Sequence, residues 1–164
     1  RQVAKRLMEG LTTANRHVQK LAHGIMPVQI DAEGLCSALS ELALEADTHE
    51  NVTCRFDCSR PLVVHDSGTA THLYRIAQEA LNNSLRHGQA KEIGLSLSKD
   101  NEVLTLSVID NGIGFDPDAQ RRNGAASEGM GLRIMRYRAG IIGGVLDIER
   151  NKSGGTTVRC TVGF

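Results

Sequence analysis

The hydrophobic positions divide the chain into two parts with different periods. Within residues 1–25 the apolar side chains recur at alternating intervals of three and four residues, at Ala4, Leu7, Leu11, Ala14, Val18, Leu21 and Ile25. This is a heptad seam, which favours pairing with a partner helix over burial in a broad core. Gly24 and Pro27 predict its end, and Asp31 is the predicted N-cap of a second helix. The first part, residues 1–48, is therefore predicted to be helical-bundle material.

From residue 49 onward, strands alternate with helices. Helical spacing of apolar residues predicts helices at 69–87 and 130–142, and residues 111–128 form a polar loop without periodicity. Period-two alternation predicts strands at residues 52–58, 93–97, 104–108, 145–148 and 156–162. The prediction is an α+β domain over residues 49–164, with helices covering one face of a mainly antiparallel sheet.

The composition narrows the classes of function. Lys and Arg together number 19, as do Asp and Glu, so the formal net charge is zero and a general nucleic-acid binder is disfavoured. Aromatic residues make up 3%, which leaves little surface for stacking on bases. No apolar run has the length of a membrane span. We expect no contact with nucleic acid or membrane, and the start at Arg1, within a pattern, suggests a fragment.

The four cysteines do not have the spacing of a metal site. Cys54 and Cys58 lie on either side of Phe56 at period two, as on one buried face of a strand. No Cys-x-x-Cys pair occurs, and no matching pair of ligands follows. With Cys36 and Cys160, they are predicted to be small buried thiols in a reducing cytosol.

The helix predicted at 69–87 carries the first group of polar residues with a chemical interpretation. Glu79, Asn83 and Arg86 share one side of this helix, away from its apolar stripe, and His87 follows at its end. A carboxylate and an amide one turn apart can hold hydrated Mg²⁺ through oxygen atoms. Cations one turn further on can meet phosphate oxygens. A solvated helix face is the alternative interpretation.

The second group is the segment Asp110-Asn111-Gly112-Ile113-Gly114-Phe115. Asp110 is in phase with the inward-facing residues of the preceding strand, so its carboxylate is predicted to point into the domain. An unpaired buried carboxylate is costly, and an exocyclic amine of a purine would supply a donor. Gly112 and Gly114 would let the backbone approach a ligand closely. A tight turn is the alternative.

The third group begins the helix at 130–142. Gly129-Met130-Gly131-Leu132 is a glycine-rich entry to a helix, which presents free N–H groups to an anion. The segment is neither a P-loop nor a dinucleotide-binding fingerprint. Further on, Gly154-Gly155 predicts a turn, and Thr156 shares the inward phase of the last strand, so its hydroxyl is expected to face the same cavity as Asp110. In this order the motifs describe one ATP site with a mobile lid at residues 116–128.

The ordered motifs resemble the ATP-binding catalytic domain of bacterial sensor histidine kinases, in the nitrate/nitrite-sensor-like subfamily of the GHKL ATPases. Residues 72–87 resemble the N box, 110–115 the first glycine box, 129–144 the second glycine box, and 154–160 the closing strand. Residues 21–39 resemble the helical linker of the same subfamily. The resemblance implies the Bergerat fold, a two-layer α/β sandwich, over residues 49–164, preceded by the second dimerisation helix and linker in residues 1–48.

The resemblance also implies roles for individual residues. Asn83 would ligate Mg²⁺ and Glu79 would assist the metal or its water, and these two are the predicted catalytic residues. Asp110 and Thr156 would bind the adenine of ATP. The pocket and phosphate cradle would be formed by Gly112, Gly114, Gly129, Met130, Gly131 and Leu132, with Arg86 and His87 near the phosphates.

The activity implied is transfer of the γ-phosphoryl group of Mg-ATP to a histidine, and then to an aspartate of a response regulator. The full-length protein would be a homodimer, membrane-anchored, with this part in the cytoplasm. In the family an acidic residue follows the acceptor histidine, but here His17 precedes Val18 and His23 precedes Gly24. The acceptor is therefore predicted to lie outside this chain, which would then be unable to phosphorylate itself.

Two alternatives remain open at this stage. A serine kinase of the anti-sigma-factor type would share the ATP site but would modify a serine of a partner protein. A degenerate domain would serve as a partner-binding module, with nucleotide structural or absent. The heptad helix favours the histidine kinase over the first alternative, and the complete set of Glu79, Asn83, Asp110 and Thr156 disfavours the second.

Overall fold

A computed structural model describes residues 34–58, 62–114, 129–152 and 154–163 of the chain. The described elements are, in chain order, α2 (Leu35–Asp47), β1 (Thr53–Asp57), α3 (Ser67–Arg86), β2 (Glu92–Asp100), β3 (Val103–Asp110), α5 (Met130–Ile141), β4 (Val145–Arg150) and β5 (Thr156–Gly163). The heptad segment at 1–25, with His17 and His23, and the predicted lid at 116–128 lie outside the described residues.

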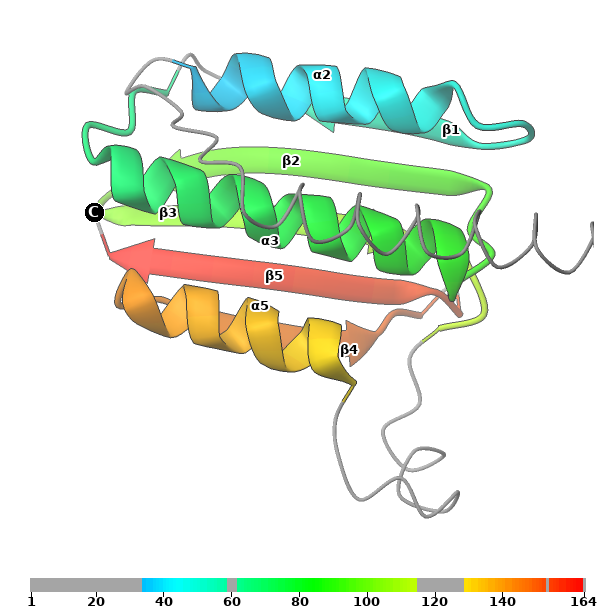
Figure 1. Cartoon of the computed structure of the whole chain (residues 1–164). Coiled ribbons are helices and arrows are strands. Elements are labelled where there is room, and N and C mark those ends of the chain that lie inside the picture. The colour runs from blue at the N-terminus through cyan, green and yellow to red at the C-terminus, as the bar shows by residue number, and fades with distance from the viewer. Residues whose placement is uncertain (1–33, 59–61, 115–128, 153, 164) are drawn as a thin grey trace, which may run out of the picture.

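The described strands form one sheet with the order β1-β2-β3-β5-β4. β1 pairs with β2 in parallel, and the other three pairs are antiparallel. The three described helices cover one face of this sheet, with α2 beside β1, α3 in the middle and α5 over β4 (Figure 1). The predicted two-layer α+β architecture is therefore confirmed, and no described helix is long and apolar enough to span a membrane.

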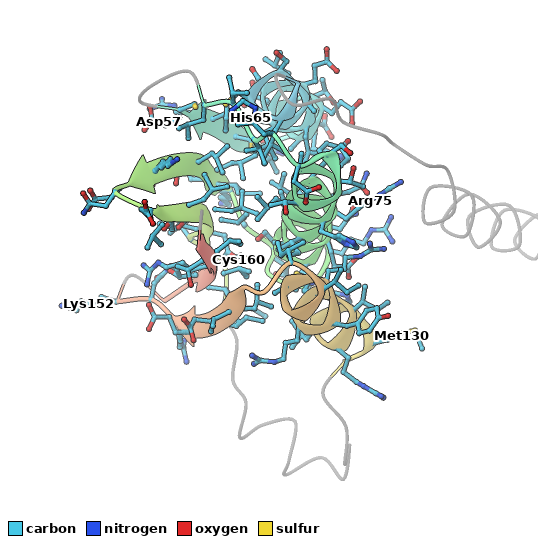
Figure 2. The ribbon with its side chains drawn as sticks, turned by 90° about the vertical axis from the view of Figure 1, so that its left-hand side faces the viewer. Asp57, His65, Arg75, Met130, Lys152 and Cys160 are labelled. Carbon is cyan, nitrogen blue, oxygen red and sulfur yellow. The ribbon has the colours of Figure 1, made fainter. Side chains whose placement is uncertain are left out.

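The core fills the space between the helices and the sheet. Figure 2 shows the two layers side by side, with Cys160 of β5 pointing between them. The largest fully buried side chains include Leu35 and Leu39 of α2, Leu73 and Ile76 of α3, and Leu95, Leu104 and Leu106 of the sheet. All of them belong to one continuous cluster. Side chains on both sides of the predicted boundary between residues 48 and 49 belong to this cluster, so α2 packs against the sheet.

A side-chain cap defines the start of α3 but not the start of α2. Asp66 caps α3 because its carboxylate accepts hydrogen bonds from the backbone N–H groups of Gly68 and Thr69, at 3.3 and 2.8 Å. This places the start of α3 two residues before the predicted one. At α2 the N-cap is Gly34, without a side-chain hydrogen bond. The prediction of Asp31 as the N-cap was wrong, because an uncapped turn at Gly34 precedes the described helix.

The register of the sheet brings the ends of three elements together. Asp110, the last residue of β3, pairs with Ile93 of β2, and Ile109 pairs with Thr157 of β5. The end of β3 therefore lies beside the start of β5. α3 packs over β3 and against α5, so its last turns lie above the same corner. This corner is where the predicted site residues meet.

Candidate functional site

A pocket of about 360 Å³ opens between the C-terminal half of α3, the start of α5 and the adjoining ends of β3 and β5. It is lined by all of the predicted site residues except Arg86 and Gly112: Glu79, Asn83, His87, Asp110, Gly114, Gly129, Met130, Gly131, Leu132 and Thr156. Motifs that are separated by up to 77 positions in the sequence are thus brought to one cavity. Its remaining lining is Ala80, Ser84, Gly88, Ile148 and Val158.

Asp110 is the buried carboxylate at the centre of this corner. Its side chain is 4% exposed. Oδ1 accepts hydrogen bonds from the N–H groups of Gly112, at 2.8 Å, and Thr156, at 3.1 Å, and Oδ2 accepts one from the hydroxyl of Ser84, at 2.8 Å. The inward orientation is confirmed. Part of the donor set that a buried carboxylate needs is supplied by the protein itself, because two backbone N–H groups and one hydroxyl converge on it.

The hydrogen-bond count at Asp110 leaves room for one further donor. An ionised carboxylate has about four acceptor sites on its two oxygens. Among the described residues, Oδ1 has two donors and Oδ2 has one, so the acceptor site that they leave open is on Oδ2. Because Asp110 lines the pocket, we expect a ligand N–H group to approach that site. The arrangement suits recognition of a single amine on a planar base.

The turn between β4 and β5 closes over the backbone of Asp110. The side-chain amide of Asn151 donates to the carbonyl oxygen of Asp110 at 2.8 Å. A Cβ atom at Gly155 would collide with that same carbonyl group, so the close approach requires glycine. Sequence reasoning missed Asn151 and also Ser84. For Ser84 a signal existed, since it is a polar residue within the apolar stripe of α3, whereas Asn151 gave none.

Glu79 and Asn83 lie one turn apart on α3 and face the start of α5. A Cβ atom at Gly131 would collide with Oε1 of Glu79 and lie 3.6 Å from Nδ2 of Asn83. Gly131 thus allows the two helices to approach closely at the pocket. Among the described residues, no group of three or more His, Cys, Asp and Glu side chains could enclose a metal ion. The Glu79 and Asn83 pair fits Mg²⁺, which keeps several waters and takes few protein ligands.

The first turn of α5 supplies backbone donors to the pocket. Gly129 is the N-cap and makes no side-chain hydrogen bond, and the first intrahelical bond runs from Arg133 N–H to the Gly129 carbonyl at 3.2 Å. The N–H groups of the preceding helical residues have no partner within the helix. Met130 is 79% exposed, so the approach to these groups is open. This end of α5 can accept an anion such as a phosphate.

Two of the predicted site residues, Arg86 and Gly112, do not line the pocket. Arg86, the last residue of α3, is exposed and does not line the pocket. Gly112 does not line the pocket, and a Cβ atom there would collide with the carbonyl group of Gly88. Its N–H group holds Asp110 instead of a ligand. Gly114 lines the pocket with a φ of 80°, a left-handed conformation that favours glycine.

The ionisable groups with the clearest pKa shifts on α3 lie nearer its start than the pocket. Burial lowers the pKa of His72, and the charge of Arg138 lowers it further, while Asp66 acts in the opposite direction. Burial and the charge of Arg138 also lower the pKa of Arg75, whose guanidinium donates to Oε1 of Gln78 at 2.8 Å. This cluster belongs to the packing between α3 and α5, where Arg75 is 8% exposed.

Comparison with known proteins gives the chain a family context. Residues 68–164 match the family model described as histidine kinase-, DNA gyrase B- and HSP90-like ATPase. The chain is 33% identical to the sensor histidine kinase MctS of Rhizobium johnstonii over 91% of its length and 32% identical to the sensor histidine kinase LiaS of Bacillus subtilis over 91%. It is 34% identical to the nitrate/nitrite sensor protein NarX of Escherichia coli over 82%. It spans 32%, 39% and 22% of these relatives' lengths.

Solved structures with the same fold include two from distinct bacteria. A histidine kinase domain of a blue-light activated kinase from Erythrobacter litoralis has a TM-score of 0.64 and 21% identity, covering 83% of this chain and 64% of that one. The ATP binding domain of PrrB from Mycobacterium tuberculosis has a TM-score of 0.57 and 20% identity, covering 79% and 93%. At these identities the likeness establishes the fold.

Proposed function

Because this chain belongs to the family of histidine kinase-, DNA gyrase B- and HSP90-like ATPases, we propose that it is the ATP-binding catalytic part of a sensor histidine kinase. Membership of an ATPase family makes ATP the nucleotide. The kinase assignment is supported by MctS and LiaS, which are sensor histidine kinases and match 91% of the chain. The whole protein would be longer, since the chain spans less than half of each of these relatives.

The observation that carries the proposal is the single acceptor site on the Asp110 carboxylate that the described part of the chain leaves open. The N6 amine of adenine is a donor that fits a site with one remaining lone pair, whereas guanine presents a carbonyl oxygen at that position. Thr156 stands beside Asp110 in the same wall, and its N–H group already holds the carboxylate at 3.1 Å. We assign the base to this corner of the pocket.

The triphosphate would extend from the base toward the start of α5. There Glu79 and Asn83 would hold Mg²⁺ through one carboxylate and one amide oxygen, with waters and phosphate oxygens completing its shell. The metal would neutralise charge that develops on the phosphoryl group during transfer. The backbone N–H groups following Gly129 would bind phosphate oxygens, and His87 at the pocket edge would be within the same region.

The chain's own residues would position and shield the nucleotide. Phosphoryl transfer to an imidazole needs little covalent chemistry from the protein, and catalysis comes mainly from alignment and charge neutralisation. The acceptor histidine would be supplied by a dimerisation helix of the full-length homodimer, and the phosphate would pass to a response-regulator aspartate. We place this part of the protein in the cytoplasm, where ATP is available.

We also propose that the catalytic domain begins before Leu35 instead of at residue 49. α2 shares its buried face with the core of the sheet, so removing it would take away Leu35, Leu39 and Leu42 and expose the core side chains that they cover. Residues 1–33 would then be the dimerisation segment and linker. A chain starting at residue 34 is expected to fold, and a chain starting at residue 49 is expected to aggregate.

A calorimetric titration tests the nucleotide site first. We expect binding of a non-hydrolysable ATP analogue in the micromolar to millimolar range, weakened by chelating Mg²⁺ and absent with the GTP analogue. Equal binding of both analogues would reject the assignment of Asp110 to adenine. Mixing the chain with labelled ATP and a fragment that carries an acceptor histidine is then expected to give an acid-labile, base-stable phosphate. An acid-stable phosphate would indicate a serine acceptor.

A further inference from the structure

Two of the four cysteines lie against each other at the corner where α2 meets the end of β1. The Sγ atoms of Cys36 and Cys58 are 3.0 Å apart. Cys36 is the second residue of α2, and Cys58 directly follows the last residue of β1. Both are thiols, and both are half-buried, contrary to the expectation that all four cysteines are buried. A disulfide bond is about 2.05 Å long, so the two sulfurs would have to approach each other by only about 1 Å to form one.

The other two cysteines have a different environment. Cys54 is 7% exposed and Cys160 is fully buried, at 0%. Burial raises the pKa of each thiol to about 11, with the charge of Asp47 adding to the effect at Cys54. Because the thiolate is the reacting form, we expect these two thiols to react slowly at neutral pH. They provide an internal comparison for the pair at the corner.

We propose that Cys36 and Cys58 form a reversible disulfide, which makes the corner between α2 and β1 a redox modification site. The oxidant is a low-molecular-weight disulfide of the glutathione type. The thiolate of one cysteine attacks a sulfur of the oxidant, which gives a mixed disulfide and releases one glutathione thiolate. The second cysteine attacks the protein sulfur of that mixed disulfide and releases the other. Two protein thiols have lost two protons and two electrons, and one glutathione disulfide has become two thiols.

The bond would join two elements at the point where the upstream chain enters the domain. Cys36 and Cys58 are 22 positions apart, so the disulfide closes a loop that contains all of β1 and most of α2. The start of α2 directly follows residues 1–33 in the sequence. Oxidation would therefore fasten this entry point to the sheet, and reduction would release it. No residue of α2 or β1 lines the nucleotide pocket, so the proposal stands independently of the function proposed above.

The test is to incubate the chain with oxidised glutathione and to map its thiols by mass spectrometry after alkylation. We expect the intact mass to fall by two hydrogens, without an adduct, and the peptides containing Cys36 and Cys58 to be linked. Cys54 and Cys160 should remain as thiols that react only after denaturation. Added reduced dithiol should restore the original mass. Thiol peptides at Cys36 and Cys58, glutathione adducts on either, or disulfide-linked dimers would each overturn the proposal.

Thermal unfolding provides a second measurement on the same samples. Closing a loop of this size is expected to raise the melting temperature of the oxidised chain by roughly 5–10 °C over the reduced chain. The variants C36S and C58S should show no difference between the two conditions. The matched control C54A keeps both Cys36 and Cys58, so it should retain the difference in melting temperature between the oxidised and reduced samples. If C54A does not fold, the peptide map of the unaltered chain decides the question alone, and an equal melting temperature with and without oxidant would contradict the proposed closure.

Discussion

At the β3 end of the pocket, the Asp110 carboxylate accepts three hydrogen bonds from the protein. At the α5 end, neither Glu79 nor Asn83 makes a side-chain hydrogen bond with another described residue, although both face the pocket. The first end is held in one geometry before any ligand arrives. The second consists of side chains and backbone groups that a metal and phosphates would have to complete. With the proposed assignment, the comparison teaches that recognition of the base would be built into the fold, whereas the phosphate end would be assembled by its ligand.

The largest effect is expected from D110N, which alters the preorganised end at a single atom. The amide oxygen can keep the N–H groups of Gly112 and Thr156, and the hydroxyl of Ser84 can turn to accept from the new amide. That amide then presents a donor to the adenine amine, so ATP affinity should fall roughly 100-fold, or about 2.7 kcal/mol, while the fold is retained. Calorimetry and circular dichroism check both statements. Unaltered affinity would refute the assignment of the base.

Two glycine substitutions, one at each end of the pocket, should differ in how strongly they destabilise the domain. G155A places a Cβ atom against the backbone of Asp110, which cannot move away, and should destabilise the domain by about 2–3 kcal/mol. G131A meets the far end of the Glu79 side chain, which can rotate, and should cost less than about 1 kcal/mol. Urea unfolding measures both. If G131A were the more damaging change, the α5 end would be the rigid one.

Removal of Asn83, a proposed metal ligand, should weaken ATP binding only when the metal is present. N83A is expected to weaken ATP binding roughly tenfold in Mg²⁺, because one oxygen ligand is lost, and to have little effect in a chelator. N82A, which changes an exposed asparagine on the adjacent position of α3, is the matched control. A similar loss with and without Mg²⁺ would assign Asn83 to packing and would leave Glu79 alone as the proposed ligand of the metal.

The smallest effect is expected from S84A. Loss of its hydroxyl leaves Oδ2 of Asp110 without a protein donor, which should lower stability by about 1 kcal/mol and ATP affinity a few-fold. The affinity for a purine nucleotide without the exocyclic amine should not change. S98A, at an exposed serine of β2, serves as the control. An equal loss for both nucleotides would mean that Ser84 supports the fold and not the orientation of the carboxylate.

Sequence periodicity was sufficient to predict the direction of a side chain where that direction depends only on the helix or strand that carries the residue. The inward direction of Asp110 followed from the two-residue period of β3, and the placement of Glu79 beside Asn83 followed from one helical turn. The donors to Asp110 could not be predicted, because Ser84 is 26 positions away and the contact exists only after α3 packs on the sheet. Arg86 was predicted to lie at the site because it shares a side of the helix with Asn83. It does not line the pocket, because it is the last residue of α3, beyond the part of the helix that packs on the domain. Cys58 was assigned to a buried face by extending the strand period past Asp57, where β1 ends.

The parallel pairing of β1 has a consequence for synthesis on the ribosome. β2 and β3 are neighbours in the chain, as are β4 and β5, so each antiparallel pair can close through a short turn. β1 can pair with β2 only after residues 58–100 have been synthesised, which takes roughly 2–9 seconds at typical elongation rates. During that interval it is an unpaired strand on a growing polypeptide. Its length of five residues, with the outward-facing charges of Arg55 and Asp57, limits adhesion to other nascent chains.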